Sequence, residues 1–399
     1  MKIRQSSTRW LGLALACGTL TFAVATQAGK PAPPPPSPSP SYTLTQLSGL
    51  PGFTTCDAED VNDSGQVVGR MQTVNGQWHA VVWETATAAP TDLDNGWGLS
   101  EAYAINNSGQ VVGRCRFVGD ASPHPAVWIP DGLGGYAPTD LIGDVGLNGS
   151  AYDINDSGFV AGYFLLDGVE MGFVICPEDR DADGVPDTWF RDDGTGFNDL
   201  MFLLEPHANA DGVEPYAIND LGWVVGKDFT PSGYGAFVII PDDTLPNPWF
   251  ADQNGDGIND LMIHLDASHA HDVNNAGQIV GSDDWSWNSR MWTVVVAPNG
   301  SVTITTTTLP KPNTMKHGPS SAINDRGQVV GTGQNRTRDL DNRPLLWEQG
   351  KGTMLLESLL SDLAGFSDLD TASAINERGQ IVGEGTTSAG QRVYLATPK

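Results

Sequence analysis

Short apolar runs alternate with a recurring polar turn along most of this chain. Seven nine-residue segments share a pattern with Val or Ile first, Asn second, Gly fifth, two apolar residues seventh and eighth, and Gly ninth. This pattern is typical of two short strands joined by a tight turn, because Asn accepts hydrogen bonds from the amides ahead of it and Gly tolerates a left-handed backbone. The seven copies lie at residues 61–69, 105–113, 154–162, 218–226, 273–281, 323–331 and 375–383.

A third apolar run follows the turn motif. Its clearest copies are His79–Trp83, Pro125–Ile129 and Pro344–Trp347, and they lack the polar alternation of a half-exposed strand. Runs of this kind are expected for strands buried on both faces. A weaker fourth strand is indicated at positions such as 91–93 and 139–141.

The spacing and the two ends of the repeat array indicate a closed ring. Successive motif asparagines lie 44 to 64 residues apart, which is typical of propeller blades. Residues 42–47 resemble a fourth strand without a blade before it, and residues 392–395 resemble a third strand without a fourth. The first strand can therefore complete the last blade and remove the open sheet edges. We predict an all-β fold, a seven-bladed β-propeller over residues 42–399, with an open β-array as the alternative.

The N-terminal segment predicts export. A basic start and an apolar run, followed by small residues, make residues 1–28 a secretory signal peptide with cleavage after Ala28, and the run is too short and too polar to span a membrane. A lipoprotein signal at Cys17 is the alternative. Residues 29–41 are nearly all Pro, Ser and Ala, which makes them an extended linker. We expect a secreted protein, extracellular, periplasmic or at the cell surface.

Charge narrows the range of partners. The chain has 48 acidic and 21 basic residues and a net charge of −27, which repels nucleic acid and anionic membranes. The predicted partner is therefore an unknown extracellular ligand, a polysaccharide or a protein. The cysteines that follow the signal, Cys56, Cys115 and Cys176, are odd in number and widely spaced, so they read as packing residues. A Cys56–Cys115 disulfide is left open.

The turn motif followed by His79–Trp83 resembles the HAF-type extracellular repeat of bacterial secreted proteins. The resemblance covers nearly all of residues 42–399, although the His-Ala part is complete only at His79 and Ala80. It implies an exported repeat protein and supplies no catalytic residues.

Two acidic insertions, at about 177–201 and 241–262, interrupt the repeat. Each contains a loop with oxygen-bearing side chains at positions 1, 3, 5 and 9, a Gly at position 6 and a backbone carbonyl at position 7, the arrangement that Ca²⁺ requires. The predicted ligands are Asp179, Asp181, Asp183, the carbonyl of Val185 and Asp187 in the first loop, and Asp252, Asn254, Asp256, the carbonyl of Ile258 and Asp260 in the second.

Both loops resemble the calcium loops of thrombospondin type 3 and dockerin repeats. They lack the bidentate Glu at position 12, where Phe190 and Ile263 stand, so we expect weak, extracellular-range affinity. Residues 192–196 read as a third, shortened loop with fewer ligands. An acidic loop without metal is the alternative for each.

Catalytic motifs are scarce. The sequence has no Gly-x-Ser-x-Gly motif. A cluster of His264, His269 and His271 reads as incidental rather than as a transition-metal site, and Trp285 and Trp287 read as packing residues rather than as a sugar platform. We predict a non-catalytic, calcium-stabilised binding or surface-interaction protein. The alternative is a secreted propeller hydrolase or lyase that acts on an extracellular polymer.

Overall fold

The computed structural model describes residues 42–399 except positions 95, 97, 144–146, 181–184, 193, 195, 205–211, 231–232, 256–257, 284–287 and 336–341. The described residues all fall within one compact unit, Pro38–Lys399. The predicted signal peptide (1–28) and linker (29–41) lie outside the described residues. No helix in the described part of the chain is long and apolar enough to cross a membrane.

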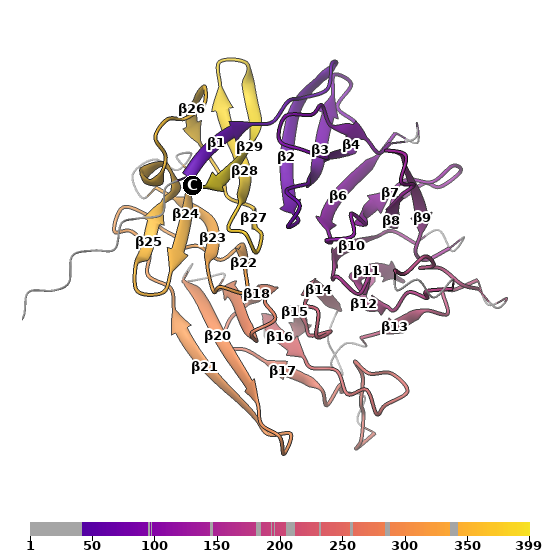
Figure 1. Ribbon diagram of the computed structural model, residues 1–399. Helices are drawn as coiled ribbons and strands as arrows, with labels where there is room; N and C mark the ends of the chain where they lie inside the picture. The colour runs from indigo at the N-terminus through magenta and orange to yellow at the C-terminus, as the bar shows by residue number, and fades with distance from the viewer. Residues whose placement is uncertain are drawn as a thin grey trace, which may run out of the picture. The chain divides into compact units, whose positions relative to one another are not determined.

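Seven antiparallel sheets follow one another around a ring, which confirms the predicted all-β, seven-bladed propeller (Figure 1). Blade 1 consists of β2 (Phe53–Val61), β3 (Val67–Thr73), β4 (Trp78–Trp83) and β5 (Thr91–Asp92). Blade 2 consists of β6 (Ser100–Ile105), β7 (Val111–Cys115), β8 (His124–Pro130) and β9 (Tyr136–Asp140). Blade 3 consists of β10 (Gly149–Ile154), β11 (Val160–Leu166), β12 (Val169–Ile175) and β13 (Met201–Leu203). Blade 4 consists of β14 (Val213–Ile218), β15 (Val224–Thr230), β16 (Gly233–Ile239) and β17 (Met262–His264). Blade 5 consists of β18 (His269–Val273), β19 (Gln278–Ser282), β20 (Ser289–Val296) and β21 (Val302–Thr308).

Blades 6 and 7 depart from the regular pattern. Blade 6 consists of β22 (Ala322–Ile323), β23 (Val329–Gln334), β24 (Asn342–Glu348) and β25 (Gly352–Leu355), followed by the 3-10 helix η1 (Leu356–Leu359). Blade 7 consists of β26 (Phe366–Leu369), β27 (Ala374–Ile375), β28 (Ile381–Thr387) and β29 (Gly390–Pro398). Its inner strand is thus divided into β26 and β27, and both pair with β28. The first strands of neighbouring blades contact one another, so they surround the central channel.

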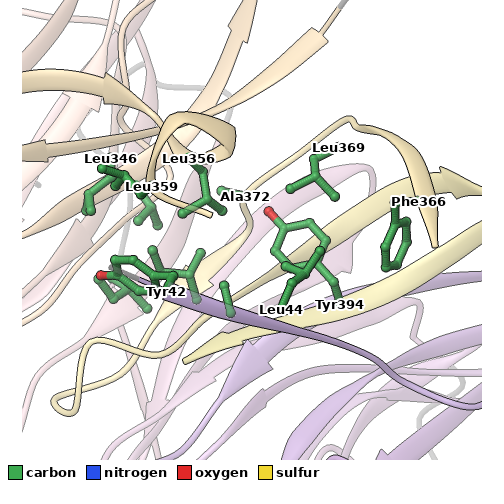
Figure 2. Packing of buried hydrophobic residues seen from close by; sticks show 13 residues of the cluster. Tyr42, Leu44, Leu346, Leu356, Leu359, Phe366, Leu369, Ala372 and Tyr394 are labelled. Carbon is green, nitrogen blue, oxygen red and sulfur yellow. The ribbon is translucent and has the colours of Figure 1, made fainter. Parts of the chain in front are cut away.

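The ring closes as the two chain ends predict. Strand β1 (Tyr42–Gln46) pairs antiparallel with β29 as the outer strand of blade 7, in a register that places Tyr42 opposite Pro398. Tyr42 and Leu44 from β1 pack between blades 6 and 7, in the same apolar cluster as Leu356 and Tyr394 (Figure 2). Strand β1 therefore contributes to the core between blades 6 and 7.

The cysteines pack as small apolar residues. All three are free thiols, and Cys56 and Cys115 are buried in separate clusters. Burial raises the pKa of the Cys56 thiol to about 11. The disulfide that the sequence left open is therefore not formed in this structure.

The motif asparagine performs two tasks. The Oδ1 atom of Asn219 accepts hydrogen bonds from the amides of Leu221 and Trp223 at 3.0 and 2.9 Å, which fixes the turn as the sequence predicts. Its Nδ2 atom donates to the carbonyl of Asn274 in the next blade, at 2.9 Å. All seven motif asparagines make this second bond, and the last, from Asn376 to the carbonyl of Asn62, closes the circle.

The two glycines of each motif are required for different reasons. Gly109, the fifth residue of its motif, has φ +77° and occupies the left-handed turn position that the sequence predicts. Gly113, the ninth, is not a turn residue. A Cβ atom there would lie 1.9 Å from the carbonyl oxygen of Glu101 on the inner strand, so only Gly lets these two strands approach.

The asparagine ring generates a stability prediction. Replacing Asn219 with Ala removes three hydrogen bonds and leaves buried backbone groups unpaired, which should lower the free energy of unfolding by about 2–4 kcal/mol. Leu221→Ser, an exposed change in the same turn, should alter it by less than about 0.5 kcal/mol. Urea unfolding followed by tryptophan fluorescence measures both, and equal values for the two variants would contradict a structural role for the ring.

Candidate functional site: an aromatic arc and a polar pocket

A β-bulge recurs on the inner strands of blades 1 to 5, three residues before the motif asparagine. A bulge leaves one residue out of the ladder and redirects its side chain. Because these strands surround the channel, the bulge residues of neighbouring blades can meet. They are Glu59, Tyr103, Tyr152, Tyr216 and His271.

Four of these side chains form a continuous aromatic arc across blades 2 to 5. The ring centroids of Tyr103 and Tyr152 are 5.6 Å apart, and those of Tyr152 and Tyr216 are 5.8 Å apart. Tyr216 stacks on His271 at 6.1 Å with 13° between the ring planes. At these separations aromatic rings attract one another, so the arc is a fixed surface of half-buried rings.

Lys227 on β15 lies against Tyr216 of the arc and against two further aromatic rings. Its Nζ atom lies 5.6 Å from the ring centroid of Tyr216, 4.9 Å from that of Phe229 and 5.2 Å from that of Tyr234. The same Nζ atom forms an ion pair with Glu214 at 2.6 Å. Tyr234 is half exposed, so solvent reaches the arc at this point.

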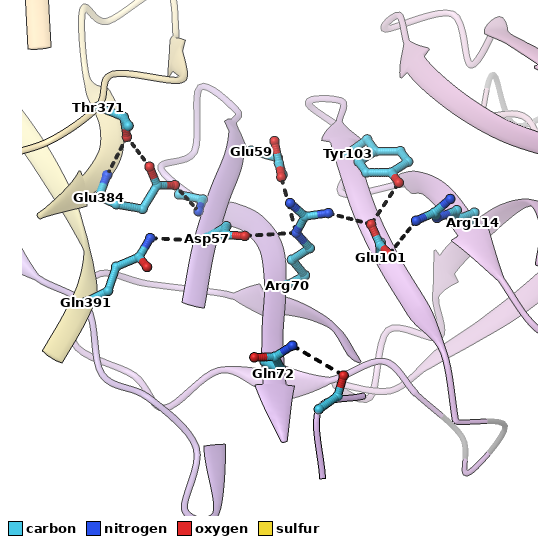
Figure 3. A network of polar contacts seen from close by, with 12 residues as sticks. Asp57, Glu59, Arg70, Gln72, Glu101, Tyr103, Arg114, Thr371, Glu384 and Gln391 are labelled. Carbon is cyan, nitrogen blue, oxygen red and sulfur yellow. Dashed lines mark hydrogen bonds and ion pairs between the residues drawn. The ribbon is translucent and has the colours of Figure 1, made fainter. Parts of the chain in front are cut away.

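A charged network joins the arc to blade 1 (Figure 3). Arg70 on β3 pairs with Asp57 at 2.9 Å in its own blade and with Glu101 at 2.6 Å in blade 2. Arg114 contacts the other oxygen of Glu101 at 2.6 Å, and Tyr103 donates its hydroxyl to Glu101 at 2.9 Å. Burial of Glu101 favours its neutral form, but Arg114 and Arg70 outweigh burial and lower the pKa. Arg70 and Arg114 are thus both paired with one buried carboxylate.

A polar pocket of about 290 Å³ adjoins the arc between blades 5 and 6. His271 belongs to both, and its Nε2 atom lies 3.0 Å from the hydroxyl of Ser282. Burial, with smaller effects from His269 and Lys227, lowers the pKa of His271 to about 4, so this imidazole is neutral at pH 7. The pocket is lined by hydroxyl groups, two imidazoles and a glycine, from His271, Ser282, Ser289, His317, Gly318, Ser320, Ser321 and Thr332.

The opposite mouth of the channel, on the side of the turns, is an acidic hollow of about 390 Å³. Its acids have structural partners. The Asp63 amide donates to the Asn107 side chain at 2.8 Å, and the same link recurs around the ring until the Glu377 amide donates to Asp63. Deeper inside, Asp272 accepts hydrogen bonds from the amides of Val273 and Ile323, and burial still raises its pKa to about 6.

Both acidic insertions lie between the third and fourth strands of blades 3 and 4. A buried tryptophan anchors each one to the turn of its own blade: Trp189 donates to the carbonyl of Gly158, and Trp249 to that of Gly222, both at 2.8 Å. The insertions therefore lie on the same side as the Asn–Gly turns.

Three predicted calcium ligands, Asp181, Asp183 and Asp256, lie outside the described residues. In the first loop, Glu178 and Thr188 form an antiparallel bridge, so the described Asp179, Val185 and Asp187 lie on a loop with joined ends. The second loop, with Asp252, Asn254, Ile258 and Asp260, is closed by the Asp260 amide, which donates to the Ala251 carbonyl at 2.7 Å.

The two candidate calcium loops occupy different places within their insertions. The loop at 251–260 corresponds to the shortened loop at 191–199, because a buried asparagine clamps each: Asn259 and Asn198 donate to the carbonyls of Trp249 and Trp189, both at 2.7 Å. The loop at 178–188 corresponds instead to a tight turn in blade 4, where the Asp242 amide donates to the Pro248 carbonyl.

The three histidines of the cluster have different partners. His264 contacts the buried Asp228 at 2.9 Å, whereas His269 and His271 stack on each other with ring centroids 5.7 Å apart. Trp285 and Trp287 lie outside the described residues.

The tyrosines of the arc did not emerge from the sequence. Aligning the seven motifs places Glu, three Tyr, His and two Ser at the third position before Asn. That polar or aromatic position lies between apolar neighbours, and it is the signal that could have indicated a bulge.

No family model and no curated protein sequence matches the chain. Similar solved structures include TolB from Acinetobacter baumannii (12% identity, 73% of this chain and 63% of that chain, TM-score 0.39) and an acylaminoacyl peptidase from Pyrococcus horikoshii (11%, 87% and 53%, 0.43). Another is the Aleuria aurantia lectin (10%, 79% and 94%, 0.33). The chain spans less than two thirds of the length of the first two. The propeller assignment comes from the strand pairing of the chain itself.

Glu384 on β28 provides a pH prediction. It accepts hydrogen bonds from the amide of Ala58 at 2.8 Å and from the hydroxyl of Thr371, yet burial raises its pKa to about 7. An unfolded Glu titrates near ~4.3, so folding favours the protonated form. This group's contribution to stability is complete below about pH 4 and is lost as the pH rises to about 7.

Glu384→Gln, which imitates the protonated form, should reduce the loss of unfolding free energy between pH 5 and pH 8 by roughly 1–3 kcal/mol. Denaturant unfolding at both pH values measures this, with Asp131→Asn at an exposed hairpin tip as the control. If the variant shows the same pH dependence as the original chain, Glu384 does not titrate in this range.

Proposed function

We propose that this chain is an exported, non-catalytic propeller that binds an extracellular polysaccharide at the aromatic arc and is stabilised by Ca²⁺ at its acidic insertions. The observation that carries the proposal is the stacked arc from Tyr103 to His271 beside the hydroxyl-lined pocket. Aromatic faces fit the apolar faces of sugar rings, and convergent hydroxyl and imidazole groups fit sugar hydroxyls.

The charge balance of the arc favours a neutral polymer over a charged one. Lys227 is paired with Glu214, and Arg114 with Glu101, so these cations are already neutralised. An anionic ligand would have to compete with those carboxylates and approach a chain with a net charge of −27. A neutral saccharide neither competes with these carboxylates nor is repelled by the net charge of the chain.

The alternative function, a hydrolase or lyase acting on an extracellular polymer, has one observation in its favour. Ser282 and His271 are within hydrogen-bonding distance in the pocket, the spacing of a nucleophile and its base. A base with a pKa of about 4 is weak at neutral pH, which favours binding without turnover. Release of reducing ends from a polymer would overturn the non-catalytic proposal.

The binding proposal predicts that removal of an exposed ring beside the arc weakens polysaccharide binding. Tyr234→Ala removes a half-exposed ring that lies beside the arc near Lys227 and should weaken binding to a neutral polysaccharide about tenfold, the equivalent of ~1.4 kcal/mol. Affinity electrophoresis with a panel of neutral and acidic soluble polysaccharides measures this. Leu133→Ser, an exposed change in the blade 2 hairpin, is the control. Retardation by no polymer, or equal weakening by both variants, would contradict the proposal.

The described part of the second insertion suits a cation. Asp252 accepts the amide of Gly255 at 2.6 Å, and Gly255 has φ +76°, so the chain turns sharply around the carboxylates. Asp260 accepts the amide of Gln253 at 2.8 Å across the loop. These carboxylates, with the carbonyl of Ile258, would hold Ca²⁺, which would offset their mutual repulsion. Asp179, Asp187 and the carbonyl of Val185 would do the same in the first insertion.

Calcium should raise the thermal unfolding temperature. Adding millimolar Ca²⁺ to the EDTA-treated chain should increase the Tm by several degrees, because a ligand that binds only the folded state stabilises it. Asp252→Asn should reduce that increase, and Asp131→Asn, which changes an acid in a hairpin tip without calcium-loop spacing, should not. Differential scanning fluorimetry measures the shift, and an unchanged Tm at millimolar Ca²⁺ rules the calcium proposal out.

A further inference from the structure

Blade 2 contains a mixed histidine and carboxylate cluster that plays no part in the arc, the pocket or the insertions. Asp120 lies in the turn after β7, His124 begins β8, and Asp140 ends β9. One ligand atom from each of the three residues lies within 4.8 Å of the others. The cluster therefore brings together three segments of one blade.

His124 is held between the two acids. Its side chain is 1% exposed, and its Nδ1 atom lies 2.8 Å from an oxygen of Asp140. The other oxygen of Asp140 accepts the amides of Ile142 and Gly143 at 3.0 and 3.2 Å, so this carboxylate is fixed and orients the imidazole. A carboxylate that positions a histidine in this way is the usual support of a metal-binding imidazole.

Asp120 lies on the other side of the ring. Its Oδ2 atom is 3.9 Å from the Nε2 atom of His124, which is too long for a hydrogen bond but near the separation of two ligands on one ion. The side chains of Asp120 and Asp140 are 27% and 21% exposed, so an ion can enter past them and keep water ligands.

In blade 1, His79 occupies the position of His124, and there the acids around the imidazole have a structural role. His79 contacts Asp92 at 3.0 Å and has Asp94 at 3.7 Å from its Nε2 atom. Asp94 accepts hydrogen bonds from the amides of Gly96 and Gly98 and from the hydroxyl of Ser100, so its carboxylate is fully engaged.

Blade 2 replaces that arrangement. From the strand register, Asp140 is the counterpart of Asp92, and Ile142 stands where Asp94 would be. The second acid comes instead from Asp120. Within the described residues, no backbone amide donates a hydrogen bond to its carboxylate, in contrast to Asp94 in blade 1. Blade 2 has therefore lost the structural acid and gained one from a different segment at the same imidazole.

The geometry points to a divalent transition-metal site in blade 2, for an ion of the Zn²⁺ class, with the Nε2 atom of His124 and an oxygen of Asp120 as ligands and Asp140 as the carboxylate that orients the imidazole. Metal–ligand bonds of about 2.0–2.2 Å require a modest contraction of the cluster around the ion. The imidazole nitrogen favours transition ions, whereas Ca²⁺ and Mg²⁺ favour all-oxygen sites. This site is thus chemically distinct from the loops proposed to bind Ca²⁺ and does not depend on the function proposed above.

The test uses the full exported chain, stripped with EDTA and then kept in millimolar Ca²⁺ to saturate oxygen-only sites. Zn²⁺ is titrated by calorimetry and Co²⁺ by visible absorption, which reports nitrogen and oxygen ligation directly. We expect one Zn²⁺ per chain with micromolar affinity. Asp120→Asn should weaken it at least tenfold, while the melting temperature in EDTA stays unchanged because Asp120 lies in a partly exposed turn.

His79→Gln in blade 1 is the matched control and should leave the affinity for Zn²⁺ unchanged. Three results would overturn the inference: no Zn²⁺ binding in the presence of Ca²⁺, unaltered binding by Asp120→Asn, or a loss of binding in His79→Gln. Each of them leaves the polysaccharide and calcium proposals untouched, since those rest on other residues.

Discussion

The hydrogen bond from each motif asparagine to the carbonyl of the next blade is the interaction on which the rest of the structure depends. The same amide fixes its own turn and the position of its neighbour, so local and long-range order cannot be separated. Because Asn376 returns to Asn62, the set is a circle without a first member. A buried amide with all its partners satisfied strongly favours one arrangement over any other, since an alternative leaves several groups unpaired.

This circle sets the geometry of the channel wall. With the turns fixed, the inner strands accommodate one extra residue each in blades 1 to 5, and the ninth glycine provides the space for it. The bulge then presents Tyr103, Tyr152, Tyr216 and His271 to one another. The corresponding residues are Glu59 in blade 1, Ser321 in blade 6 and Ser373 in blade 7, so one part of the wall is aromatic and the rest is polar. The pocket lies beside His271, where the aromatic part ends.

Much of the fold could be predicted from the chain because its signals are local and repeated. The Asn–Gly turn, the apolar third strand and the unpaired ends at 42–47 and 392–395 specify seven blades and their closure. The site could not be predicted, because its residues owe their proximity to an irregularity. A bulge shifts Tyr216 out of register, and no periodicity in a single strand marks that. Asp120 was missed for a related reason: it meets His124 only after β7, β8 and β9 are packed together.

The pairing of β1 with β29 has a mechanical consequence. Tyr42 lies opposite Pro398, so both ends of the described chain leave the same sheet at the same end. Inter-strand hydrogen bonds in an antiparallel pair run perpendicular to the strands. A force that pulls Tyr42 away from Pro398 therefore breaks these hydrogen bonds one after another, beginning at that end, rather than stretching all of them at once. Under tension between these two residues, the pairing of β1 with β29 would yield first.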